Sequence, residues 1–269
     1  MKNTRIAIIG AGNMGSSLLA GLITAGLNPA FIWVSNPSLE KLERLQQTLG
    51  VHITQNNAEA AQHAEVIILA VKPNNTASVT KELAAILPQH HPLMISLAAG
   101  ITTAQLEQWL GNTTAIVRCM PNSPSLIRAG VSGLYANSNT TDIQRDLAES
   151  MLRAVGTIVW LDHEKQMDAL TALSGSGPAY FFLVMEALQE AGEKMGLPPE
   201  TARLLTLQTA LGASRMALES DNALSELRRK VTSKGGTTEA AINVFEKRNL
   251  REIFTDALQA AKTRSEELS

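Results

Sequence analysis

Cysteine, aromatic residues and net charge are all scarce in this 269-residue chain. The single cysteine, Cys119, excludes an intrachain disulfide framework and is typical of a reducing compartment. Aromatic residues make up 4% of the chain, which leaves few side chains on which bases or sugars could stack. With 23 basic and 25 acidic residues, the net charge is −2, so no basic excess can neutralise a nucleic-acid backbone. We therefore expect no nucleic-acid partner.

Long apolar runs are missing as well. Lys2 and Arg5 precede a stretch from Ile6 to Leu27 that superficially resembles a signal peptide, but Asn13 and several glycines interrupt it. A strand, a glycine loop and a helix explain those glycines, whereas a signal peptide does not. No other stretch approaches the ~20 apolar residues that cross a bilayer. We therefore expect a cytoplasmic protein with no membrane segment.

The composition supports a packed core, with 45% hydrophobic and 18% charged residues. In the first part of the chain, short β-rich runs alternate with helical patterns. Most of these runs are continuously apolar, which is typical of parallel strands buried on both faces. We expect Asn36 to cap the helix that begins with Pro37, and Gly50 to end it. The predicted strands are Arg5–Ile9, Phe31–Ser35, Val66–Val71, Leu93–Leu97, Thr114–Cys119 and Thr157–Leu161.

Strand patterns disappear after about residue 162, and only helical periodicity remains. The stretch Thr201–Leu218 is apolar over much of its circumference, as in a helix central to a bundle or buried against a partner chain. We therefore predict an α/β protein: a Rossmann-type doubly wound sheet over residues 1–161, then an all-α domain over residues 162–269. The predicted helices are Met167–Leu173, Ala179–Met195, Pro199–Glu219, Ala223–Lys230, Glu239–Lys247 and Leu250–Glu267.

A glycine motif, Gly10-Ala11-Gly12-Asn13-Met14-Gly15, follows the first predicted strand and opens a helical pattern. In this position Gly10 allows a tight turn, Gly12 allows a pyrophosphate to approach, and Gly15 allows the helix to pack on the strand. The amides at the start of the helix then face the phosphates. The motif predicts a dinucleotide site in residues 1–161.

The end of the second predicted strand indicates which dinucleotide binds. Enzymes that use NAD usually place an acid there for the ribose 2′-hydroxyl. Here the segment Ser35–Ser38 is neutral, the first acid is Glu40, and Lys41 and Arg44 follow in the next helix. Small neutral donors beside cations favour a 2′-phosphate, so we expect NADP(H) in preference to NAD(H).

Other loops lie where strands end or helices begin. Ala70–Pro73 and Ser96–Gly100 each follow a strand, and ligands of open α/β sheets bind outside the carboxyl ends of strands. Read alone, each of these loops could equally be a strand exit with a turn. Met120–Pro124 carries two prolines that could wall a pocket or simply turn the chain. Ser174–Ala179 opens a long helix with glycines that allow close backbone approach.

A second glycine loop, Thr232–Glu239, opens a helix in the all-α part of the chain. Converging amides, a helix N-terminus and threonine hydroxyls could bind a small anionic substrate there. The alternative is a glycine-rich turn between helices that is capped by threonine. The histidines at positions 52, 63, 90, 91 and 163 have no metal-ligand spacing, and Cys119 has no companion thiol, so we expect no metal.

Taken in order, these motifs resemble the pyrroline-5-carboxylate reductase family, whose members catalyse the final step of proline biosynthesis. Two positions depart from the family pattern: Ser123 stands where threonine is usual, and Lys234 where proline is usual. The resemblance runs nearly end to end and rests on Gly10–Gly15, Ala70–Pro73, Ser96–Gly100, Met120–Pro124, Ser174–Tyr180 and Ser233–Thr238.

The resemblance implies reduction of 1-pyrroline-5-carboxylate to L-proline by hydride from NADPH. It implies a homo-oligomer, at least an intertwined dimer formed through the helical domain and often assembled into larger rings. It places the substrate carboxylate at Ser233, Gly236 and Thr237, the catalytic Thr238 hydroxyl near the ring nitrogen, and Glu164 near the substrate. The cofactor contacts that it implies are Gly10, Gly12, Asn13, Met14, Asn36, Ser38, Asn57, Val71, Lys72, Ala98 and Ala99.

The chemistry of a cyclic imine agrees with this implication. A protonated imine is already electrophilic, so its reduction needs position and electrostatics more than a strong general acid. Related hydroxyacid dehydrogenases carry a catalytic lysine shortly after the second-domain glycines, where this chain has Tyr180, Phe181 and Phe182. Two alternatives stay open: a related NADP-dependent imine or β-hydroxyacid reductase, and a non-catalytic NADP-binding regulator.

Overall fold

The computed structural model describes residues 3–87 and 91–268, so Lys2 and His90, named above, lie outside the described residues. By contact density the chain forms two units. The first comprises Met1–Ser176 together with Ala261–Ser269, and the second comprises Gly177–Ala260.

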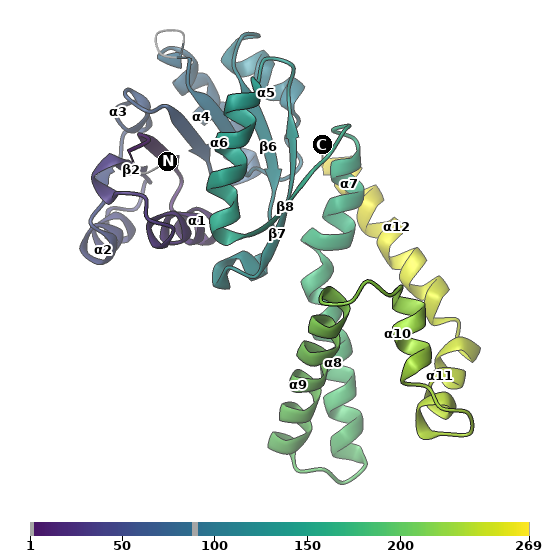
Figure 1. The fold of residues 1–269 in the computed structure, drawn as a ribbon. Helices are drawn as coiled ribbons and strands as arrows, with labels where there is room; N and C mark the ends of the chain where they lie inside the picture. Colours follow the sequence, from purple (N-terminus) through teal and green to yellow (C-terminus); the bar gives the residue numbers. More distant parts are fainter. Residues whose placement is uncertain (1–2, 88–90, 269) are drawn as a thin grey trace. The chain divides into compact units, whose positions relative to one another are not determined.

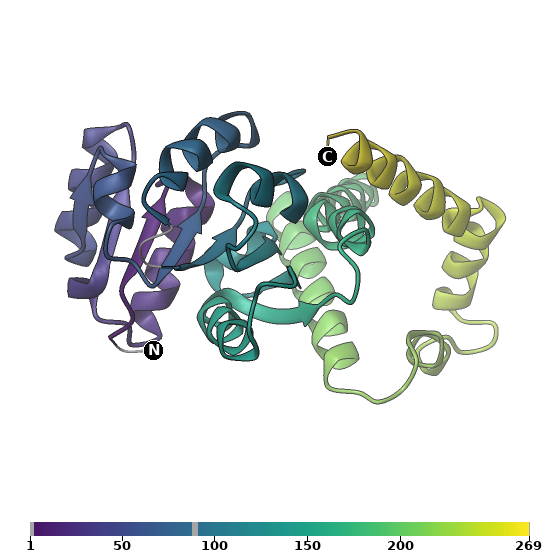
Figure 2. The same ribbon diagram turned by 90° about the horizontal axis from the view of Figure 1, so that it is seen from above.

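One sheet organises the first unit (Figure 1, Figure 2). In the described residues it has eight strands in the order β3-β2-β1-β4-β5-β6-β7-β8. All neighbouring strands are parallel except β6 and β7, which are antiparallel. The predicted Rossmann-type fold class is thus confirmed. The strands are β1 (Ile6–Ile9), β2 (Ile32–Ser35), β3 (His52–Thr54), β4 (Val66–Leu69), β5 (Leu93–Ser96), β6 (Ile116–Met120), β7 (Gly130–Ala136) and β8 (Gly156–Trp160).

Two strands were not predicted. β3 has only three residues and begins with exposed His52 at one edge of the sheet, so it carries too little apolar pattern. β7 contains Gly130 and Gly133, which weaken a strand pattern. At Gly133 a Cβ atom would collide with the side chain of Leu170, so the glycine allows the helix that carries Leu170 to lie close against β7.

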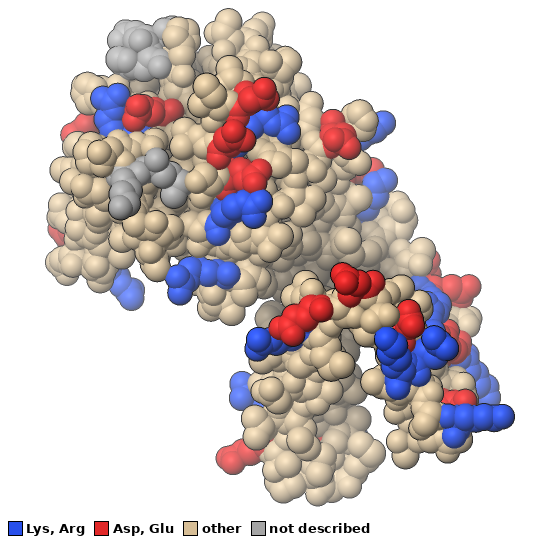
Figure 3. All heavy atoms as spheres, viewed as in Figure 1, with Lys and Arg blue, Asp and Glu red and all other residues tan. Residues whose placement is uncertain are grey.

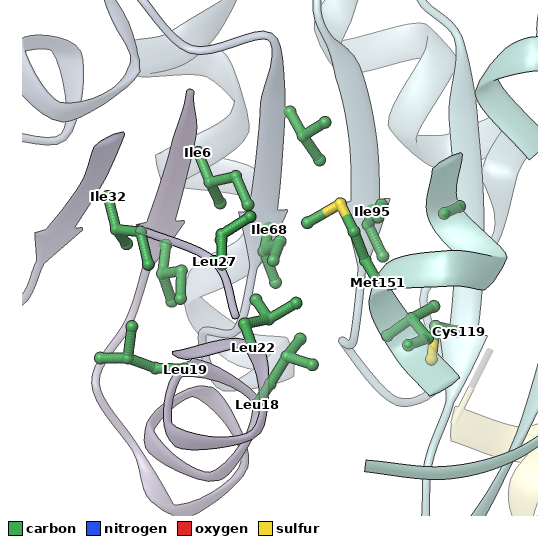
Figure 4. Packing of buried hydrophobic residues seen from close by; sticks show 14 of the residues in the cluster. Ile6, Leu18, Leu19, Leu22, Leu27, Ile32, Ile68, Ile95, Cys119 and Met151 are labelled. Atoms are coloured by element: carbon green, nitrogen blue, oxygen red, sulfur yellow. The ribbon is translucent and has the colours of Figure 1, made fainter. Parts of the chain in front are cut away.

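Helices cover both faces of the sheet (Figure 1). A hydrophobic core cluster lies on each face of the sheet, and alternate residues of β1 point into the two clusters. Ile6 and Ile8 belong to one cluster, and Ala7 and Ile9 belong to the other. Figure 4 shows Leu18, Leu19 and Leu22 of α1 directed toward strand residues of the first cluster. The first layer contains α1 (Asn13–Thr24), α2 (Leu39–Leu49) and α6 (Asp142–Leu152), and the second contains α3 (Asn57–Ala61), α4 (Pro73–Ala84) and α5 (Thr103–Leu110).

The start of α2 differs from the prediction. Ser38, not Asn36, caps the helix, and its hydroxyl accepts the backbone N–H of Lys41 at 3.5 Å. Asn36 fails as a cap because its side-chain oxygen instead accepts the N–H of Ala11, at 3.1 Å. The predicted end is confirmed: Gly50 follows the helix with φ of 70°, a left-handed conformation that suits glycine.

The contact-based division falls later than the predicted boundary after residue 161. Helix α7 (Gln166–Leu170) and a π-helix (Thr171–Gly175) continue the first unit beyond β8. The last turns of α12 (Leu250–Leu268) also belong to it, and Ser265 donates a hydrogen bond to Asp168 at 2.7 Å. The two units and the predicted domains thus assign residues 162–176 differently, and the predicted boundary stays a prediction.

The second unit contains only helices among its described elements. Helices α8 and α9 pack side by side through buried Gly192 and Ala202 (Figure 1). The large apolar side chains along α9 are exposed in the single chain, including Leu204 at 66% and Leu211 at 62%. The helices are α8 (Gly177–Lys194), α9 (Pro199–Leu218), α10 (Leu224–Lys230), α11 (Thr237–Lys247) and most of α12.

Candidate functional site

The glycine loop after β1 forms a close-packed turn beside open space. Gly10 has φ of 107°, and a Cβ atom there would lie 2.6 Å from the carbonyl oxygen of Ala70. A Cβ atom on Gly15 would collide with the carbonyl oxygen of Gly10. A Cβ atom on Gly12, by contrast, would meet nothing within 4 Å. Only the Gly12 side of the turn therefore leaves room for a ligand at the start of α1.

A cavity of about 330 Å³ lies at the carboxyl ends of the strands around this turn. It brings together six of the predicted cofactor residues: Gly10, Gly12, Asn36, Asn57, Val71 and Lys72.

The other predicted cofactor residues lie outside this lining. Asn13 and Met14 begin α1, which has Gly12 as its N-cap residue and no side-chain cap. The first amides of that helix are thus available to an anion. Ser38 caps α2, while Ala98 is buried and Ala99 exposed in the loop after β5.

Two asparagines present hydrogen-bond donors to the cavity. The side-chain oxygen of Asn36 accepts the N–H of Ala11. The side-chain oxygen of Asn57 accepts the hydroxyl of Ser35, and its amide nitrogen donates to Glu82 at 2.9 Å. Both oxygens thus accept from donors within the protein, which leaves the Asn36 amide and the second N–H of Asn57 able to donate. The described lining contains Lys41 and no Asp or Glu, so the cavity suits an anionic group.

Sequence reasoning missed part of the lining. Gln55 follows the unpredicted strand β3, and its amide donates to the carbonyl oxygen of Pro37 at 2.7 Å. Asn56, next in sequence, caps α3 by accepting from two backbone N–H groups. The pair Asn56-Asn57 after a short β-rich run was the signal that could have indicated a strand, a cap and a site residue together.

In the second unit, the predicted substrate loop leads into α11. Gly235 has φ of 71°, and the N–H of Gly236 donates to the carbonyl oxygen of Ser233 at 3.1 Å. A Cβ atom on Gly236 would lie 2.5 Å from the Ser233 hydroxyl oxygen, so a larger residue there would displace the Ser233 side chain. Thr237 and half-buried Thr238 are the first residues of α11.

The loop is closed by an acid, not by a threonine cap. Gly236 is the N-cap residue of α11 and no side chain caps the helix there. Instead, the Glu239 carboxylate accepts the N–H of Gly235 at 2.7 Å. This bond fixes the glycine turn, and it excludes the simple threonine-capped turn that the sequence left open.

A cavity of about 610 Å³ adjoins Glu239 between α10 and α11. Arg228 and Arg229 line it, and basic side chains gather over this region of the surface (Figure 3). Arg228 pairs with Glu246 at 3.0 Å, and a hydrogen bond from Arg251 holds the pKa of the Glu246 carboxyl below its ordinary value. The cavity's arginines are thus engaged with carboxylates, and its described lining includes none of Ser233–Thr238.

Glu164 lies in the first unit, whereas Ser233–Thr238 lie in the second. The carboxylate of Glu164 accepts the backbone N–H of Thr103 at 2.8 Å, the Thr103 hydroxyl at 2.6 Å and a guanidinium N–H of Arg118 at 2.9 Å. Sequence reasoning could not find these partners, because Thr103 and Arg118 are distant from Glu164 along the chain. No group of three His, Cys, Asp or Glu among the described residues could hold a metal ion.

The fold and its two glycine loops define an oxidoreductase with a Rossmann-type nucleotide-binding domain followed by a helical domain. Residues 5–100 match the family model described as NADP oxidoreductase, coenzyme F420-dependent, and residues 164–268 match that for pyrroline-5-carboxylate reductase dimerisation. The chain belongs to the pyrroline-5-carboxylate reductase family and is thus an oxidoreductase that acts on a carbon–nitrogen bond.

Relatives match the chain over its full length. Pyrroline-5-carboxylate reductase from Pseudomonas aeruginosa is 50% identical over 269 residues, which cover 100% of this chain and 98% of the relative. The solved structure of the Coxiella burnetii reductase is 52% identical, covers 99% of both chains and has a TM-score of 0.95. The Plasmodium falciparum enzyme, solved with NADP bound, is 31% identical, with a TM-score of 0.89 over 100% of this chain and 99% of that one.

A more distant likeness concerns the fold alone. Prephenate dehydrogenase from Aquifex aeolicus shares 17% identity, with a TM-score of 0.55 over 99% of this chain and 100% of that one. Within the described residues, no helix combines the length and the hydrophobicity that a bilayer crossing requires.

Proposed function

We propose that this chain reduces 1-pyrroline-5-carboxylate to L-proline with hydride from NADPH, the final step of proline biosynthesis. The observation that carries the proposal is the donor-lined cavity around Gly10, Asn36 and Asn57, in a chain whose whole length resembles curated reductases of this name. That cavity suits a phosphorylated dinucleotide, which a reductase of this class requires.

The proposed cofactor is NADP(H), in preference to NAD(H). Open space beside Gly12 and the uncapped start of α1 suit a pyrophosphate. Asn36, Ser38 and Lys41 would surround a 2′-phosphate, and no described acid of the lining would accept from a free 2′-hydroxyl. When bound, the reduced nicotinamide supplies a hydride.

The proposed substrate site is the loop at the start of α11. Ser233, Gly236 and Thr237 would bind the substrate carboxylate through hydroxyl and amide donors, and the Thr238 hydroxyl would bind the ring nitrogen. A protonated imine is already electrophilic, so these residues act by orienting it and need not supply a strong acid. The role of Glu239 is to hold the loop by accepting the N–H of Gly235.

The proposed assembly is a homo-oligomer, at least a dimer. An apolar groove of about 480 Å³ runs between α8 and α9, and Phe181, Leu188 and Leu205 are among its exposed lining residues. Monomeric proteins rarely leave so large an apolar surface in water. A second copy of the chain is the occupant that the match of residues 164–268 to a dimerisation family supports.

A cytoplasmic location completes the proposal. Its support is the single cysteine, Cys119, which is buried and would need no oxidising compartment. Fractionation of the source cells, with activity as the readout, tests this part separately from the reaction.

The reaction is tested by following NADPH oxidation with 1-pyrroline-5-carboxylate, beside a β-hydroxyacid with NADP⁺. We expect oxidation that depends on the imine, and no reduction of NADP⁺ by the β-hydroxyacid. Turnover of the β-hydroxyacid or only of a different imine would favour a related reductase. Binding of NADPH without any turnover would favour a non-catalytic regulator, and each of these outcomes overturns the proposal.

A further inference from the structure

The Glu164 carboxylate has donors on both of its oxygens. One oxygen accepts from the backbone N–H of Thr103 and from Arg118, and the other accepts from the Thr103 hydroxyl. The side chains of Arg118 and Glu164 are only 6% and 19% exposed. Since a buried charge without its partner is strongly unfavourable, the two groups depend on each other. Glu164 is therefore bound to two separate elements of the first unit, β6 and α5.

These two elements flank one loop. Arg118 on β6 lies beside Ser96, the last residue of β5, in the parallel register. Thr103 is the first residue of α5, for which Thr102 forms the N-cap. The loop of residues 97–101 leaves the sheet beside Arg118 and enters a helix whose first residue is bound by Glu164.

The interior of this loop is also closely packed. The N–H of Ala98 donates to the Ser96 hydroxyl at 3.4 Å. Gly100 has φ of 73°, and a Cβ atom there would lie 2.6 Å from the carbonyl oxygen of Leu268. The conformation of the loop thus depends on fixed neighbours at its start, at Gly100 and at Thr103.

We propose that Arg118 and Glu164 are positioning residues for the cofactor. They hold the loop of residues 97–101, at the carboxyl end of β5, in the conformation that presents Ala98 and Ala99 to NADPH. In this role Glu164 acts through Thr103 and does not touch the substrate. The inference depends on the proposed function, because it takes Ala98 and Ala99 as cofactor contacts.

The test measures two constants for Glu164→Gln: the Kd for NADPH without substrate, and the KM for 1-pyrroline-5-carboxylate at saturating NADPH. We expect the Kd to rise roughly 2- to 30-fold, the range in which residues of a contact network modulate a distant equilibrium. The KM for the imine should stay at the wild-type value. A raised KM with an unchanged Kd means that Glu164 contacts substrate, and it overturns the inference.

A second variant and a control keep the test decisive. Thr103→Val removes one donor to Glu164 with little change in size, and it replaces Glu164→Gln in the test if that variant does not fold. The Kd of Thr103→Val for NADPH should also rise.

Glu149→Gln is the matched control, because Glu149 on α6 also accepts three hydrogen bonds, from Trp160 and Arg153. If Glu149→Gln raises the Kd equally, general destabilisation explains the effect and the inference is wrong. If the wild-type protein fails to bind NADPH, the proposed function itself fails.

Discussion

Asn36 serves the glycine loop with its oxygen and leaves its amide hydrogens for the cavity. Asn57 likewise accepts with its oxygen, from Ser35, but it donates one of its amide hydrogens to Glu82. At the scale of single residues, orientation matters as much as identity, because an amide whose oxygen faces a donor within the protein turns its N–H groups the other way. An aspartate at position 36 could keep the bond to Ala11 while reversing what the cavity offers.

The first prediction concerns Asn36→Asp. The carboxylate still accepts the N–H of Ala11, but it loses the donor and repels a 2′-phosphate. We expect kcat/KM with NADPH to fall roughly 10- to 100-fold, the effect of losing a hydrogen bond to a charged group. Efficiency with NADH should be retained or improved. Asn74→Asp, on α4 but outside the cavity lining, should change neither value, and a wild-type preference for NADH would contradict the assignment.

Thr238→Ala should impair turnover and leave folding nearly unchanged. Thr238 lies in the first turn of α11, but the N-cap residue is Gly236, so alanine removes no helix cap. The loss of a positioning hydrogen bond of about 1–3 kcal/mol corresponds to a roughly 5- to 150-fold lower rate. Melting temperature and catalytic efficiency are measured together. A variant that melts earlier yet keeps the parental rate would show that Thr238 is only a helix residue.

Cys119 should be unreactive in the folded protein. Burial raises the pKa of its thiol to about 12, against a smaller opposite effect of the hydrogen bond with Ser132. Between the unfolded pKa of ~8.5 and this value, the unfolded chain binds fewer protons, so the thiol's contribution to stability falls as pH rises through that window. Labelling by a thiol reagent at pH 8 should match the unfolding rate. Rapid stoichiometric labelling of the native protein would contradict this expectation.

At the scale of helices and strands, the sequence predicted those features that depend on residues close together in the chain. Continuous apolar runs predicted six strands, and Gly10–Gly15 predicted the turn into α1, because both depend on residues close in sequence. β7 was missed because its two glycines weaken the strand pattern. The reason for one of them, Gly133, is the packing of Leu170 from a later helix, which the local sequence does not show. The hydrogen-bond partners of Glu164 and Glu239 were missed for the same reason, since bonds to distant or backbone partners leave no spacing pattern.

Helix α2 offers a prediction at this scale. Ser38→Ala removes the hydroxyl that accepts the N–H of Lys41. The free energy of unfolding should fall by about 1 kcal/mol, as for other N-cap losses. Chemical denaturation measures it, with Ser78→Ala in α4 as a control, because that hydroxyl bonds a carbonyl oxygen within its helix and caps nothing. Equal effects of the two substitutions would contradict the capping role.

At the scale of the whole molecule, the exposed faces of α8 and α9 are the largest departure from the usual burial of apolar side chains. A helix as apolar as α9 is typical of a buried position, yet Leu204, Leu205 and Leu211 are more than half exposed in the single chain. Two copies that bury these faces against each other would remove this exposed apolar surface from water. Oligomerisation would then form part of the protein's stability.

Leu205→Glu should therefore dissociate the oligomer. Leu205 is 52% exposed and lines the apolar groove, and a two-fold interface would repeat the substitution. Loss of two buried leucines weakens association by at least ~3 kcal/mol. Light scattering measures the result, with Ile143→Glu as the control, because Ile143 is 81% exposed on α6 and away from the groove. Wild-type protein that scatters only as a monomer would contradict the assembly.

The chain leaves its first unit at Ser176 and returns to it at Ala261. During synthesis, the sheet can therefore form long before the last turns of α12 emerge from the ribosome. Only then can Ser265 reach Asp168 and Leu268 reach Gly100. The loop that we assign to the cofactor thus receives its final contact from α12. A nascent chain would therefore have its sheet before the loop of residues 97–101 was complete. A chain shortened within α12 would have the sheet and lack the loop's contact with Leu268.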